Sequence, residues 1–292
     1  PAPAAGAAAL DSPDDAAALG HFFAVMLGQL RGASLFLLLY VSRLLSPNPA
    51  FAAAWLDSSG LSRLLLLVRP PVLAESDPSA PSPAARVMGF LCASNLVAAT
   101  GGLLRLASRA PSADAATLVD AALAAAGAPG PAAAHEARAA AALLQNLAIS
   151  LREIGPRGAA AAPKIEPATG VRGDHTTTEA ELTRLAPRVR RDAAASASVL
   201  ESIRQQLLSG ACAPLAAQDD PQALQRLVVC LGSLVAERLD GTAPAPPVGR
   251  PAALSPAAAE ELLTRLLATK CETRPVELDA MVREVRSMVR RL

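Results

Sequence analysis

The sequence predicts an all-α protein, and three observations on its composition and apolar spacing lead there. Hydrophobic residues make up 52% of the 292 residues, whereas aromatic residues make up only 2%. A core of that kind must consist of Ala, Leu and Val, which suits closely packed helices better than strands. Apolar residues also recur at helical spacing along the chain, and no segment alternates as a half-buried strand does.

The chain opens with a tract that we interpret as a linker. Residues 1–13 are rich in Ala and Pro, and the acidic end of this tract can also cap the first helix. Because the chain begins with Pro1 rather than Met, we expect it to be a piece of a longer protein, and we expect one helical domain to fill residues 14–292.

Local signals place the helix ends in the first half of the domain. Ser34 can cap a strongly apolar helix, and Pro47 ends it. The pair Gly101-Gly102 is explained by a turn between two helices better than by a phosphate-binding loop. The helices expected here cover residues 14–30, 34–46, 50–56, 60–68, 84–99, 101–106, 113–126 and 131–154.

The second half contains one long break in the helical pattern. Gly155-Pro156 is expected to end the preceding helix, and residues 155–178 are Gly/Ala/Pro-rich and aperiodic, which predicts a disordered insertion. Asp220 can cap the helix whose first turn holds Pro221. The helices expected here cover residues 179–185, 192–208, 220–239, 255–268 and 275–292.

Many helices of modest length, joined by short loops, favour an α-solenoid of paired helices over a globular bundle. The formal net charge of +1, with one Trp and one Tyr, predicts no binding to nucleic acid. No apolar run is long enough to cross a bilayer, so no membrane contact is expected. Four dispersed cysteines and three dispersed histidines fit free thiols in a reducing compartment, cytoplasmic or nuclear, with no disulfide framework and no metal site.

Catalytic motifs are also missing from the sequence. It contains no Gly-x-Ser-x-Gly, no P-loop, no Gly-x-Gly-x-x-Gly and no His-Glu-x-x-His. The carboxylate pair Asp219-Asp220 could suggest acid–base chemistry, but Asp220 is explained as a cap and Asp219 as a loop residue. We therefore predict a binding protein with no catalytic residues and no cofactor, rather than an enzyme.

Four apolar helical segments carry an arginine or an asparagine at a characteristic place. Residues 220–235 are the most distinctive of them, with Arg226, Leu231, Gly232 and Leu234 in order. In order and spacing the segments resemble the PUL domain, a module named after phospholipase-activating protein and its yeast relatives. The resemblance covers most of residues 20–292, and it rests on residues 35–44 followed by Pro47, 90–96, 143–148 and 220–235.

The resemblance implies an armadillo-like array whose concave groove binds the C-terminal tail of the ubiquitin-selective AAA ATPase, valosin-containing protein. That tail is acidic, and the family's groove arginines correspond to Arg43 and Arg226 here. A guanidinium suits this role because it pairs with carboxylates through two parallel hydrogen bonds. Asn95 and Asn146 are expected to bridge backbone groups between repeats or to line the groove.

The resemblance thus predicts an adaptor domain in ubiquitin-dependent processing, monomeric when isolated. Two alternatives stay open. The chain could be a helical scaffold with a different protein partner, or a helical enzyme whose constellation is not recognisable. For Arg43 and Arg226 the alternative is an arginine that lays its stem on a leucine-rich helix and extends its charge to solvent.

Overall fold

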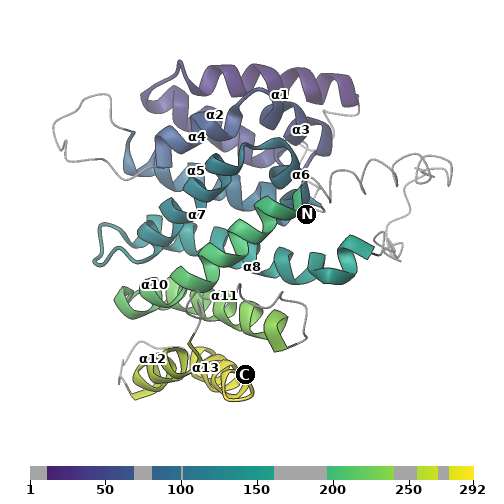
Figure 1. Cartoon of the computed structure of the whole chain (residues 1–292). Coiled ribbons are helices and arrows are strands. Elements are labelled where there is room, and N and C mark those ends of the chain that lie inside the picture. Colours follow the sequence, from purple (N-terminus) through teal and green to yellow (C-terminus); the bar gives the residue numbers. More distant parts are fainter. Residues whose placement is uncertain (1–11, 69–80, 100, 161–195, 240–254, 269–275) are drawn as a thin grey trace, which may run out of the picture.

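The computed structural model describes residues 12–68, 81–99, 101–160, 196–239, 255–268 and 276–292. Within these ranges every regular element is a helix and no residue is in a strand, so the predicted all-α class is confirmed. The helices lie in successive layers from α1 and α2 at one end to α12 and α13 at the other (Figure 1).

One line of packed helices runs through all of these layers, and we call it the long row. Each of its members packs on the next one: α2 on α5, α5 on α8, α8 on α11, and α11 on α13. Its members are α2 (Gly32–Leu45), α5 (Pro83–Ala98), α8 (Ala134–Ala160), α11 (Pro221–Leu239) and α13 (Val276–Val289).

The remaining helices pack beside the long row. α1 packs on α3 and α4, α4 on α7, α3 on α6, and α10 on α12. Gln206, in a helix over residues 196–210, donates through Nε2 to the Ala116 carbonyl of α7 at 3.3 Å. These helices are α1 (Pro13–Leu27), α3 (Pro49–Asp57), α4 (Gly60–Val68), α6 (Gly102–Arg109), α7 (Ser112–Ala126), α10 (Cys212–Ala217) and α12 (Pro256–Ala268).

Contacts between the layers recur at a nearly constant offset along the chain. Asp57 of α3 pairs with Arg109 of α6, 52 residues later, and Asn95 of α5 reaches α2 across the same offset. Between α8 and α11 the offset rises to 82. The additional residues lie between α8 and the helix at 196–210, where the sequence predicted an insertion; residues 161–178 of that insertion lie outside the described ranges.

Several helix ends follow the predicted signals. The side chain of Asp220 accepts the backbone N–H groups of Gln222 and Ala223 at 3.1 and 3.0 Å, which confirms it as the cap of α11. Gly101 has a φ of +65°, a left-handed conformation that glycine adopts without steric cost. A Cβ on Gly102 would stand 2.0 Å from a backbone carbonyl oxygen, so the glycine pair forms the predicted turn between α5 and α6.

Other predicted ends were wrong. α2 begins at Gly32 rather than after a Ser34 cap, because Gly32 takes a φ of +58° that lets the chain enter the helix three residues earlier. α8 does not end before Pro156 but continues to Ala160, since a proline removes only one backbone donor from a helix, at a cost of about 3 kcal/mol. The first six residues of the predicted insertion are therefore helical. The sequence also missed α10, which is short and holds Pro214.

The core is built mainly from small and aliphatic side chains, as the composition predicts. Along α8 the buried positions include the run Ala139 to Leu144, which lies between α5 and α11. The few aromatic residues of the core cluster in the first layers, where Trp55 and Phe51 are 2% and 1% exposed. In the part of the chain that the structure describes, no single helix is both long and apolar enough to cross a membrane; two bent pairs, α3 with α4 and α5 with α6, meet that test by length and composition alone.

Candidate partner-binding surface

The four residues that the sequence singled out all lie on the long row. Arg43 is near the end of α2, and Asn95 of the next helix donates through its side-chain Nδ2 to the Arg43 carbonyl at 3.2 Å. Arg43 is half-buried as a residue, and its guanidinium makes no hydrogen bond or ion pair with any described residue. Burial raises the pKa of the Cys92 thiol to about 12, and the nearby positive charge of Arg43 offsets part of that rise.

The second asparagine repeats the contact of the first one layer further on. Nδ2 of Asn146, in α8, donates to the backbone carbonyl of Ser94 at 3.3 Å and to its hydroxyl at 2.8 Å. Each asparagine thus ties its own helix to the preceding member of the row. An amide suits this position because its NH₂ group can donate to a backbone carbonyl of the neighbouring helix.

Arg226 lies one layer beyond the second asparagine. Its Nη1 donates to the side-chain oxygen of Gln145, the residue next to Asn146, at 3.3 Å. The side chain is exposed, and among the described residues its hydrogen-bond partner is this neutral amide. In order along the row, the structure therefore lines up Arg43, Asn95, Asn146 and Arg226, with an arginine at each end and asparagines between them.

Most other interhelical arginines have a carboxylate partner. Arg86 of α5 donates through Nε to both carboxylate oxygens of Glu136 at 3.0 Å. Arg204 reaches Glu237 of α11 at 2.9 Å, where the carboxylate is 1% exposed. Arg109 pairs with Asp57 at 2.5 Å. By contrast, neither end of the line from Arg43 to Arg226 is neutralised by an acid among the described residues.

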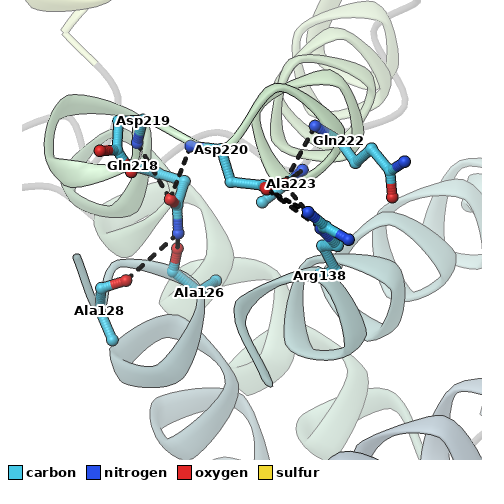
Figure 2. Close-up of polar contacts among 8 residues, drawn as sticks. All are labelled: Ala126, Ala128, Arg138, Gln218, Asp219, Asp220, Gln222 and Ala223. Atoms are coloured by element: carbon cyan, nitrogen blue, oxygen red, sulfur yellow. Dashed lines mark hydrogen bonds and ion pairs between the residues drawn. The ribbon is translucent and has the colours of Figure 1, made fainter. Parts of the chain in front are cut away.

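Another such pair joins the start of α11, the helix of Arg226, to α8. Arg138 of α8 donates to both carboxylate oxygens of Asp220, at 3.0 Å and 3.1 Å from Nε and 2.6 Å from Nη2 (Figure 2). This hydrogen bond from Arg138 lowers the pKa of Asp220 below its usual range, burial opposes that shift, and the N–H of Ala223 supports it. The Asp220 side chain is only 9% exposed, so the same carboxylate caps α11 and joins α11 to α8.

Gln218 completes this joint from the loop before α11. Its Nε2 donates to the carbonyls of Ala126, the last residue of α7, and Ala128 at 3.0 and 3.4 Å. Its side-chain oxygen accepts the N–H groups of Asp219 and Asp220 at 3.0 and 2.9 Å (Figure 2). The buried amide thereby supplies hydrogen-bond partners to two backbone carbonyls and two backbone N–H groups next to helix ends.

Sequence reasoning missed both Gln218 and Arg138. Local spacing cannot reveal either of them, because their partners lie 92 and 82 residues away. One signal was available for Gln218: an amide two residues before an N-cap Asp can accept the backbone N–H groups that precede the helix.

In the described ranges, no group of three or more His, Cys, Asp or Glu side chains could hold a metal ion. The three described cysteines are free, and two of them are fully enclosed by the core.

Comparison with known proteins adds no relative: neither a family model nor a curated protein matches this chain.

Proposed function

We propose that the chain is an adaptor domain with an armadillo-like, PUL-type arrangement, and that the surface of the long row from Arg43 to Arg226 binds an extended acidic peptide. The partner we propose is the C-terminal tail of an ATPase of the valosin-containing-protein type. The observation that carries the proposal is a contrast among arginines: Arg86, Arg138 and Arg204 each join two helices through a carboxylate, whereas neither arginine that ends this line holds one.

The repeated offset of the interlayer contacts supports the array. Ser62 of α4 donates to Asp114 of α7 across 52 residues, the same offset that separates Asn95 from Arg43. Two different lines of helices therefore advance by one common step, as neighbouring repeats of a solenoid do. A surface made by successive repeats is suited to an extended segment, because each repeat can contact a few residues of it.

The spacing of the two arginines sets the length of peptide that both can contact. Packed helices lie about 8–10 Å apart, so the three steps from α2 to α11 separate Arg43 from Arg226 by about 24–30 Å. An extended peptide advances about 3.3 Å per residue, so this distance corresponds to about eight residues. A terminal carboxylate bound at one arginine therefore leaves the other for an acidic side chain further along the tail.

A titration tests the proposal. A fluorescent peptide of the acidic tail, about twelve residues long to exceed the estimated span, is titrated with the wild-type chain and with Arg43→Ala and Arg226→Ala. A charge-assisted hydrogen bond contributes about 1.5–3 kcal/mol, so each variant is expected to weaken binding by about 10- to 100-fold. Arg283→Ala is the matched control, since Arg283 is an exposed arginine of α13, one layer beyond the helix that ends the line.

Each outcome of the titration has a definite meaning. No binding to the wild-type chain contradicts the proposed partner, and the general reading of a helical scaffold with another protein partner then takes its place. Wild-type binding that neither variant weakens contradicts the assignment of the two arginines. Salt dependence gives a second check, because contacts between exposed charges weaken as ionic strength rises.

A further inference from the structure

The layer formed by α1 and α2 leaves an apolar surface uncovered, which we call the end face. Leu37 and Leu44 of α2 are 61% and 59% exposed, and Phe22 of α1 is 55% exposed. The buried residues of α2 point to its single row neighbour, α5, so its opposite side faces away from the stack. The end face consists of Phe22, Val25, Phe36, Leu37, Tyr40 and Leu44.

The other end of the long row has a different character. α13 packs on α11 and α12 through Leu278, Val282 and Val285. Most of its exposed residues are charged or polar, including Arg283, Glu284, Ser287 and Arg290, and the exposed apolar side chain of Val276 stands apart at its first position. A stack of helices needs a polar outer side at each end to remain soluble alone, and only the α13 end has one.

The end face also has charges at its two edges. Asp14 and Asp15 lie in the first turn of α1, and Arg31 directly precedes α2. Only residues 28–31 connect the two helices, which run in opposite directions across the top of the stack (Figure 1). The acidic edge therefore lies near the end of α2, and the basic edge lies near its start.

We infer that the end face pairs with the same face of a second copy of this chain. A two-fold axis near Tyr40 sets the two α2 helices antiparallel, so Leu37 of each copy meets Leu44 of the other. The same operation brings Arg31 of each copy to Asp14 and Asp15 of the other, so the edge charges complement each other. The end face is thus self-complementary in both its apolar centre and its charges.

The exposed area fits a dimer of modest affinity. A fully exposed aromatic side chain presents about 150–250 Å², so the six side chains at their observed exposures leave about 500 Å² of apolar surface per copy. A standard interface buries about 800 Å² per partner. The polar edges of this face can supply the area that the apolar centre lacks. The inference opposes the sequence-based expectation of a monomer, and it does not depend on the proposed peptide binding.

The first test measures mass against concentration. Sedimentation velocity and light scattering of the whole chain, at roughly 1–100 µM, are expected to show a rise from 29.7 kDa to about twice that mass. The double variant Leu37→Glu/Leu44→Glu is expected to stay monomeric with an unchanged melting temperature, because both side chains are exposed. The matched control is Leu66→Glu, a leucine on α4 that is 66% exposed outside the end face.

The second test fixes the symmetry. Tyr40→Cys places a thiol near the proposed axis, so mild oxidation is expected to link two copies covalently, whereas Leu66→Cys gives no more linked product than the wild-type chain. Arg31→Asp is expected to weaken the dimer, and adding Asp14→Arg and Asp15→Arg is expected to restore it.

Three results would overturn the inference. One is a wild-type chain that remains at 29.7 kDa throughout the concentration range. Another is a dimer that survives Leu37→Glu/Leu44→Glu but not Leu66→Glu. The third is equal oxidation of Tyr40→Cys and Leu66→Cys.

Discussion

Arg138 and Arg226 occupy neighbouring helices of one row, yet their surroundings differ in kind. Arg138 holds the Asp220 carboxylate through three hydrogen bonds at the start of α11. Arg226, six residues further along α11, is exposed and contacts a neutral amide. The difference teaches that an arginine on a leucine-rich helix is interpretable only from its partner: one with a buried acid supports the fold, and one without an acid has a charge available for another molecule.

The largest loss of stability is expected for Asp220, whose carboxylate both caps α11 and binds Arg138. Asp220→Ala removes the α11 cap and leaves the Arg138 guanidinium without its acid, so the free energy of unfolding is expected to fall by about 2–4 kcal/mol. Chemical denaturation measures this change. Asp219→Ala is the matched control, because the adjacent Asp219 side chain is exposed, and an equal loss in both variants would contradict the joint.

The next largest loss of stability is expected for Gln218, whose amide bonds the backbone beside the pair of Arg138 and Asp220. Gln218→Leu keeps the size of the side chain but leaves two backbone carbonyls and two N–H groups without the bonds they have now. The free energy of unfolding is expected to fall by about 1–3 kcal/mol, the cost of leaving buried polar groups unsatisfied. Gln222→Leu, on the exposed side of α11, serves as the control and is expected to change it little.

Acid should remove the contribution of Asp220 selectively. Its pKa is lower in the folded chain than in the unfolded chain, chiefly because Arg138 bonds the ionised form. The stabilisation is therefore complete above the unfolded pKa of about 3.9 and is lost as pH falls through the lower, folded pKa. The difference in unfolding free energy between wild type and Asp220→Asn is expected to be constant near neutrality and to shrink in this acidic range. A difference that grows on acidification would contradict the assigned direction.

The smallest change in the free energy of unfolding is expected for Arg226, the arginine without an acid. Arg226→Ala removes no carboxylate partner and no buried contact, so the free energy of unfolding is expected to change by less than about 0.5 kcal/mol. Thermal and chemical denaturation of Arg226→Ala and Arg138→Ala, run side by side, measure the contrast. Equal destabilisation by the two variants would remove the distinction between them.

The sequence predicted those features that local chemistry decides. Apolar periodicity identified most of the helices, and the cap at Asp220 and the turn at Gly101 followed from side-chain and backbone preferences of single residues. The α8 helix, however, passes through Pro156, because a proline inside a helix removes a single backbone donor.

The candidate site was predictable only as separate residues. Arg43 and Arg226 came from a resemblance, and nothing in their own segments says that they lie on one line of helices. That line is defined by contacts such as Asn95 with Arg43 and Gln145 with Arg226, whose members are 52 and 81 residues apart. Local propensity carries no information on such pairings, and the same limit concealed the joint of Arg138 with Asp220.

The most direct test of the central claim varies the length of the bound peptide. With an acidic tail longer than about eight residues, Arg43→Ala and Arg226→Ala are each expected to weaken binding, and their effects should add because the two sites are far apart. With the last four residues of the same tail, only one of the two variants should still weaken binding, because so short a peptide cannot contact both arginines. Equal weakening of the four-residue peptide by both variants would contradict a line of separated sites along the row.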